Sequence, residues 1–396
     1  PLKLDRSSEL QCTTCHDAHN NHYGNFLVMS NTGSQMCVSC HDLNGWTTSA
    51  HESSGVLVAG ASDPYLQEGD RGTLAEVACL ACHRPHGAGG HERLLHFAQI
   101  EDNCLNCHDG MVAGTNIKAD MLKLSRHNVF QYRDVHDPRE VASAPPMHVE
   151  CVDCHNPHAV QRALVQPPMI PGAMQGVSGV TVTGSVTAHA QFGYEVCFKC
   201  HADNPERPLS DITRQITQTN TRLEFEPSGP SFHPVVSPGV NPNVPSLIPP
   251  MTVATVIDCT DCHSSDATSS ASGPHGSVYR PLLADRYETV DFTPENSSSY
   301  ALCYRCHSRN SILGDQSFAG HSEHLENGIP CSACHDAHGI NASQGSTTNN
   351  SHLINFDVVI VRPDPVTGRQ VFEDSGVFHG QCYLSCHGEN HSPKGY

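Results

Sequence analysis

Apolar residues along this chain are sparse and follow no sustained helical or strand period. Hydrophobic residues make up 37% of the 396 positions, and no window approaches 18 consecutive apolar residues. The chain also contains 31 Gly and 27 Pro, which interrupt long helices. The pattern excludes a helical bundle and a membrane span, and it predicts a mostly irregular fold with short helices and a few small hairpins.

Three segments allow a local prediction. Residues 176–192 alternate small and β-branched side chains around two glycines, which predicts a hairpin. Residues 358–361 and 370–372 flank a Pro-Val-Thr-Gly turn and predict a second hairpin. Residues 227–250 contain eight prolines and should form an extended, irregular segment.

A short motif recurs along the chain and uses every cysteine. Cys-x-x-Cys-His occurs nine times, and a tenth copy, Cys382-Tyr-Leu-Ser-Cys386-His387, has one extra residue between its cysteines. This motif is the attachment signature of c-type haem, in which both thiols bond to the porphyrin vinyl groups. Ten pairs exhaust the 20 cysteines, which leaves little weight for disulfides or zinc fingers. The predicted attachment residues are Cys12, Cys15, Cys37, Cys40, Cys79, Cys82, Cys104, Cys107, Cys151, Cys154, Cys197, Cys200, Cys259, Cys262, Cys303, Cys306, Cys331, Cys334, Cys382 and Cys386.

Histidines supply the predicted axial ligands of ten haem irons. The histidine that ends each motif is the expected proximal ligand. These are His16, His41, His83, His108, His155, His201, His263, His307, His335 and His387. A further histidine follows each motif and is the expected distal ligand. These are His19, His51, His86, His127, His158, His233, His275, His321, His338 and His391.

The remaining nine of the 29 histidines are interpreted mainly as surface or capping residues. Two of them have ligand-like surroundings. His148 is a rival to His127, and His324 is a rival to His321, as a distal ligand. Which distal histidine belongs to which iron stays open, because either neighbouring haem is within reach.

The motifs pair into five dihaem units that should form one continuous domain. At about 40 residues per haem there is little room for a conventional core. We therefore expect ten covalently bound haems to form the apolar interior and folding to depend on their attachment. The expected units are 1–78, 79–150, 151–258, 259–330 and 331–396.

Charge and termini restrict the partners and the compartment. The formal net charge is −19, so nucleic acid is an unlikely partner. Covalent haem attachment of this type takes place outside the cytoplasm. The chain begins Pro1-Leu-Lys-Leu, without Met or an apolar signal core, and we expect a mature protein that is extracellular or periplasmic.

Two imidazoles saturate an iron and leave no place for a substrate. Such a haem cycles between ferric and ferrous states, which favours electron transfer over catalysis. The alternative is a multihaem reductase of nitrite, hydroxylamine or a sulfur oxyanion. That activity needs an iron with an open or weakly ligated distal position. No motif ends in Lys, and histidine is not in short supply, so no catalytic residue is predicted.

The paired motifs resemble the doubled-CxxCH multihaem cytochromes of metal-reducing bacteria. Phrases such as Cys331-Ser-Ala-Cys-His-Asp-Ala-His338-Gly are typical of that family. The motif near the start of the chain is similar to that of its extracellular members that polymerise into conducting filaments. In those proteins the second histidine of the first motif ligates a haem of the neighbouring subunit.

The resemblance implies a head-to-tail polymer in which His19 acts in trans. It also implies redox proteins or extracellular electron acceptors as partners. The competing hypothesis is a soluble periplasmic or porin-associated electron shuttle.

Overall fold

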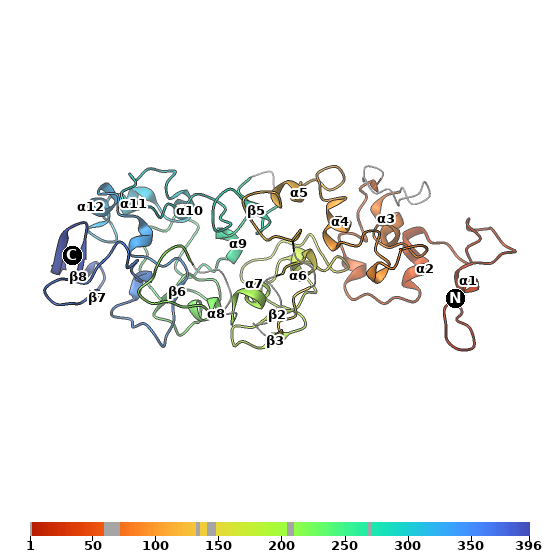
Figure 1. Cartoon of the computed structure of the whole chain (residues 1–396), viewed down its shortest axis with the longest axis horizontal. Coiled ribbons are helices and arrows are strands. Elements are labelled where there is room, and N and C mark those ends of the chain that lie inside the picture. Colours follow the sequence, from red (N-terminus) through yellow and green to blue (C-terminus); the bar gives the residue numbers. More distant parts are fainter. Residues whose placement is uncertain (1, 59–71, 132–134, 141–147, 204–209, 268–270) are drawn as a thin grey trace.

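The molecule is elongated, with its two ends far apart. The structure is a computed structural model that describes residues 2–58, 72–131, 135–140, 148–203, 210–267 and 271–396. The sequence colours advance from the N-terminal end to the C-terminal end along the long axis (Figure 1). Its solvent-accessible surface is 21000 Å², whereas a compact protein of this mass exposes about 15,000 Å². The chain therefore encloses an extended interior instead of closing around one core.

The α-helices of the described residues are short, in line with the Gly and Pro content. The longest, α7, has nine residues, and most have four. They are α1 (Cys12–Cys15), α2 (Gln35–Val38), α3 (Leu74–Val77), α4 (Ile100–Leu105), α5 (Ile117–Asp120), α6 (Cys151–Cys154), α7 (Gly193–His201), α8 (Thr221–Glu224), α9 (Cys259–Cys262), α10 (Ala301–Tyr304), α11 (Arg309–Leu313) and α12 (His321–Glu326). Short 3-10 turns are η1 (Thr32–Ser34), η2 (Trp46–Thr48), η5 (Ala78–Ala81), η6 (Glu92–Leu94), η7 (Gly172–Met174), η8 (Cys331–Ala333) and η9 (Ser351–Leu353).

Most motifs lie on a short helical turn, and a residue of the motif itself caps three of these turns. In many of them the N–H of the motif histidine donates to the carbonyl of the first cysteine, as from His155 to Cys151 at 3.0 Å. In three motifs the residue before the second cysteine, Thr14, Asp153 or Asp261, accepts a hydrogen bond from the backbone N–H at the start of the turn. Asp153 Oδ2, for example, accepts from the N–H of Glu150 at 2.8 Å. This contact satisfies an N–H that has no partner within the helix, so one turn can persist without a longer helix.

Strands are also short and form small antiparallel sheets. The pairs are β1 (Ser125–Arg126) with β5 (Gly276–Ser277), β2 (Gly179–Val180) with β3 (Val186–Thr187), and β4 (Ser231–Phe232) with β6 (Gly339–Ile340). A three-stranded sheet joins β7 (Val371–Gly376), β8 (His379–Cys386) and β9 (Glu389–Gly395) near the C-terminus (Figure 1). The β2–β3 pair confirms the hairpin predicted within residues 176–192.

The second predicted hairpin was wrong. Val371 pairs with Tyr383 of β8, and not with residues 358–361. Residues 358–361 instead form a turn in which the N–H of Val361 donates to the carbonyl of Asp357 at 2.8 Å. The longer β8 is the better partner, because its alternate residues bury an apolar face that includes Leu384.

Buried apolar residues form several small clusters along the molecule. The largest lies at the C-terminal end and the next packs around α7. The first contains Ile329, Ala333, Ile354, Phe356, Val361, Phe372, Cys382, Leu384 and Cys386. The second contains Val180, Tyr194, Phe198, Ala202, Phe225 and Val235. The fold is therefore mostly coil with short helices and small sheets, as predicted.

Candidate haem sites

A cavity of about 3560 Å³ extends through the molecule, with a lining that runs from residues near the N-terminus to Tyr396. A pocket for one small ligand measures about 300–1,000 Å³. Motif cysteines and histidines line this cavity along its length, together with apolar residues such as Val152 and Phe198. Its size and lining suit several large apolar cofactors held by thiols and imidazoles.

Imidazole rings face each other in pairs across this cavity. In the odd-numbered motifs, the motif histidine faces the histidine that follows the next odd-numbered motif. The pairs and their ring-centroid distances are His16 with His86 (5.7 Å), His83 with His158 (6.1 Å), His155 with His275 (6.0 Å) and His263 with His338 (6.0 Å).

In the even-numbered motifs the direction is reversed. The motif histidine faces the histidine that follows the preceding even-numbered motif. The pairs are His108 with His51 (6.3 Å), His201 with His127 (6.1 Å) and His307 with His233 (6.4 Å). The ninth motif breaks the rule, because His335 faces His321 at 6.2 Å. The pairs therefore join different dihaem units, and the unit boundaries themselves stay a prediction.

The ring spacing fits two imidazoles bound to one metal. Metal–nitrogen bonds of about 2.0–2.1 Å, as for zinc, place two facing ring nitrogens about 4 Å apart and the ring centroids about 6 Å apart. The eight pairs lie between 5.7 and 6.4 Å. The residues present therefore fit bis-histidine haem.

Hydrogen bonds orient many of these rings. The Nδ1 atoms of the odd-numbered motif histidines are each within hydrogen-bonding distance of a backbone carbonyl. The contacts are His16 with Asn25 (2.9 Å), His83 with Arg93 (2.8 Å), His155 with Ala173 (2.8 Å), His263 with Pro281 (3.1 Å) and His335 with His352 (2.9 Å). When Nδ1–H donates to a carbonyl, the lone pair of Nε2 is free for a metal.

The histidines that face the even-numbered motif histidines contact a second recurring set of backbone carbonyls. His51 Nδ1 contacts the carbonyl of Pro157, and His127 Nδ1 contacts the carbonyl of Pro274, both at 2.9 Å. His233 Nδ1 contacts the carbonyl of Ala337 at 2.6 Å. Each of these carbonyls directly precedes a histidine that faces an odd-numbered motif, so neighbouring imidazole pairs are linked by hydrogen bonds.

Burial keeps several of these imidazoles neutral. It lowers the pKa of His263, His307 and His335 to about 4, with nearby histidines adding to the effect for His263 and His307. Burial likewise lowers the pKa of His275 to about 4. Neutral imidazole is the form that binds a metal, so these side chains are ready for coordination at neutral pH.

Thiols of successive motifs lie beside one another. The side chain of the first cysteine of an even-numbered motif contacts that of the first cysteine of the next motif. These contacts are Cys37 with Cys79, Cys104 with Cys151, and Cys197 with Cys259. The attachment sites therefore follow one another closely along the cavity.

Two motif histidines are exceptions among the described residues, because no imidazole faces them. They are His41, in the second motif, and His387, in the last. The His387 ring stacks on Phe292 with a centroid distance of 4.1 Å, and its Nε2 contacts Asp291 Oδ1 at 2.8 Å. His19, predicted as a distal ligand, is exposed near the N-terminal end.

The tenth motif lies on strand β8 and not on a helical turn. Cys382 and Cys386 are both buried, four residues apart on one face of the strand. His391 of β9 pairs with Leu384 and so shares that face. Its ring lies 6.3 Å from that of His324. At the tenth motif the structure thus brings together His391, a predicted distal ligand, and His324, a predicted rival to His321.

Sequence reasoning missed the groups that orient the rings. Backbone carbonyls have no residue signature, and Glu224 Oε2, which contacts His338 Nδ1 at 2.9 Å, is 114 positions away in the chain. Ser246 Oγ similarly contacts His307 Nδ1 at 2.9 Å. Sequence reasoning also missed a cluster of His136, Glu140 and His148, although the four-residue spacing of the first two was visible.

Comparisons with known proteins agree with this chemistry. A family model described as "Doubled CXXCH motif" matches residues 7–44, 72–113 and 251–311. A curated relative, "Multiheme cytochrome MtrA" of Shewanella baltica (strain OS185), is 30% identical over 151 residues. The match covers 38% of this chain and 36% of that protein, so the chain spans only about a third of the relative's length. No solved structure matches the chain.

The paired motifs, the facing imidazoles and these matches support a multihaem c-type cytochrome. Among the described residues, no helix is long and apolar enough to cross a bilayer.

Proposed function

We propose that this protein is a decahaem cytochrome that conducts electrons over long distances through closely spaced bis-histidine haems. The observation that best supports the proposal is the series of eight facing imidazole pairs along an elongated molecule (Figure 1). A series of saturated irons supports electron transfer and leaves no substrate position at those sites. Of the described motif histidines, all but His41 and His387 have such a facing ring.

We further propose that copies join head to tail into an extracellular filament. The two motif histidines without a facing imidazole belong to the second and the last motif, near opposite ends of the chain. His19 is exposed near one end and His379 near the other, so each end has a candidate imidazole to offer a neighbouring copy. A contact between two different ends does not close on itself, and it therefore generates a fibre.

Short strand pairs suggest how such a contact could form. Within the chain, β1 lies just before His127 and pairs with β5, which follows His275. β4 lies just before His233 and pairs with β6, which follows His338. A neighbouring copy could add a short strand beside a facing histidine in the same way.

The test of the filament is imaging of purified holoprotein. We expect unbranched filaments from the wild type, and we expect His19→Ala to shorten or abolish them while the haem content is kept. His22→Ala is the matched control, because His22 is exposed and only three residues away. Monodisperse wild-type monomers on a sizing column would refute the filament and favour a periplasmic or porin-associated shuttle.

A further inference from the structure

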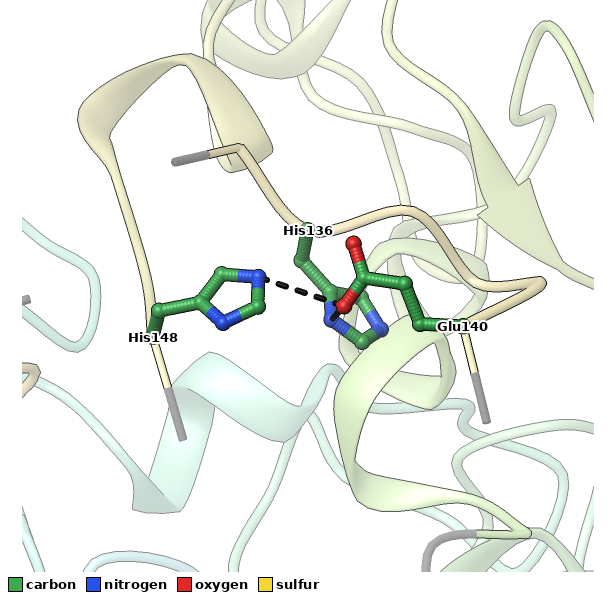
Figure 2. Close-up of side chains that lie close together, drawn as sticks. All are labelled: His136, Glu140 and His148. Carbon is green, nitrogen blue, oxygen red and sulfur yellow. Dashed lines mark ion pairs between the residues drawn. The ribbon is translucent and has the colours of Figure 1, made fainter. Parts of the chain in front are cut away.

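We propose that His136, Glu140 and His148 form a binding site for one divalent transition-metal ion, separate from the haem irons. Both rings point toward the Glu140 carboxylate (Figure 2). Glu140 Oε2 lies 3.7 Å from His136 Nδ1 and 3.4 Å from His148 Nε2. One ligand atom from each of the three residues lies within 4.8 Å of the other two.

The nearest haem motifs do not need these histidines as axial ligands. The site adjoins the fifth and sixth motifs, whose histidines are His155 and His201. His155 faces His275 and His201 faces His127, at 6.0 and 6.1 Å. His148 was a predicted rival to His127, but the geometry gives it a different neighbour, Glu140.

The spacing of the donors suits a first-row metal. With bonds of about 2.0–2.1 Å, adjacent ligands of a tetrahedral zinc ion lie about 3.3–3.5 Å apart. The distances from Glu140 Oε2 to the two ring nitrogens, 3.4 and 3.7 Å, need little adjustment to reach that range. Two imidazoles and one carboxylate are the protein ligands of open zinc sites and of non-haem iron sites.

The surrounding structure prepares His136 as a ligand. Its Nε2 contacts the backbone carbonyl of Lys199 at 3.2 Å. A proton on Nε2 that donates to this carbonyl leaves the lone pair of Nδ1 directed toward Glu140. The backbone N–H of His136 also donates to Asp153 Oδ1 at 3.0 Å, which ties the site to α6.

The site is partly shielded, and its three residues also line the haem cavity. The His148 side chain is 7% exposed and that of His136 is 18% exposed, while Glu140 is 33% exposed. The carboxylate is therefore the most exposed of the three groups, and the His148 imidazole is the most buried. A bound ion would link His136 and Glu140 to His148 next to the fifth and sixth motifs.

The experiment uses the haem-loaded protein and zinc as the probe. Holoprotein is stripped of loosely bound metal with a chelator, equilibrated with zinc sulfate, and assayed for zinc per chain by elemental mass spectrometry. We expect one tightly bound zinc ion in the wild type. His148→Ala and Glu140→Gln should each weaken the affinity for zinc by at least ~10–100-fold. That is the loss that follows removal of an outer-shell partner. His189→Ala, at an exposed histidine outside the cluster, should leave zinc binding unchanged.

Two results would overturn the proposal. One is equal zinc binding by the wild type and by the Glu140→Gln and His148→Ala variants. The other is a low-spin haem that becomes high-spin in His148→Ala, because His148 would then be an axial ligand. Neither readout depends on filament formation, so this proposal and the proposed function fail separately.

Discussion

At the residue scale, one charge pair, Lys199 and Asp153, is buried between two haem motifs. The side chains of Lys199 and Asp153 are 3% and 1% exposed, and Lys199 Nζ lies 3.6 Å from Asp153 Oδ1. Removal of one member leaves the other charge buried without its partner, which costs about 3–5 kcal/mol. We therefore expect Lys199→Met to lower the free energy of unfolding by that amount, measured by guanidinium unfolding.

The control for this prediction is an exposed pair of the same type. Lys394 and Glu323 are 47% and 63% exposed and lie 3.4 Å apart. Water screens such a pair, so Lys394→Met should cost less than about 1 kcal/mol. Equal losses in the two variants would show that burial does not set the strength of the Lys199–Asp153 pair.

A second residue-scale prediction concerns pH. Burial, with a smaller effect from Asp261, raises the pKa of Asp258 to about 6 from its ordinary 3.8. The ionised carboxylate is therefore less favourable in the folded state than in the unfolded state, and stability is lost as the pH rises from about 4 through 6. With allowance for solvent screening, Asp258→Asn should stabilise the protein by about 1–2 kcal/mol at pH 7.

That stabilisation should disappear near pH 4, where the folded wild type already has a neutral Asp258. Guanidinium unfolding of both proteins at the two pH values checks this. A larger benefit at pH 4 than at pH 7 would reverse the expected sign and refute the mechanism.

At the scale of the elements, short strand pairs next to the facing histidines leave no room for an added side-chain atom. Gly276 of β5 pairs with Arg126 of β1 and directly follows His275. A Cβ at Gly276 would lie 1.8 Å from the carbonyl oxygen of Asp120. Overpacking of this kind costs about 1–3 kcal/mol or more. Gly276→Ala should therefore displace His275 and convert one haem from low-spin to high-spin.

Gly114 provides the matched substitution. A Cβ there would meet no atom within 4 Å, and the backbone is not left-handed. Gly114→Ala should therefore leave both stability and the visible haem spectrum nearly unchanged. A spectrum for Gly276→Ala that is identical to that of Gly114→Ala would contradict the role assigned to the β1–β5 pair.

The elements that could be predicted are those that local chemistry determines. Cys151–Cys154 forms one turn because Asp153 caps it, and the β2–β3 hairpin follows from its alternating residues. β8 was not predicted, because the Cys-x-x-x-Cys spacing gave no reason to expect a strand. On a strand, two residues four apart point to the same face, so the extra residue keeps Cys382 and Cys386 together.

At the scale of the whole molecule, the pairing of ligands was beyond the sequence. His51 and His108 are 57 positions apart and His155 and His275 are 120 apart, and nothing in the intervening residues specifies either contact. The alternation of direction between odd-numbered and even-numbered motifs appears only in three dimensions. Motif chemistry predicted the class of protein, whereas the order of imidazoles along the cavity depends on tertiary contacts.

The protein is proposed to hold a continuous series of haems, each between two imidazoles. The most direct test is to count haems per chain in purified, fully oxidised holoprotein and to assign their spin state by near-infrared magnetic circular dichroism. We expect ten haems, all low-spin with two nitrogen ligands, in the assembled protein. A count clearly below ten, or a high-spin fraction of about one haem per chain, would contradict it.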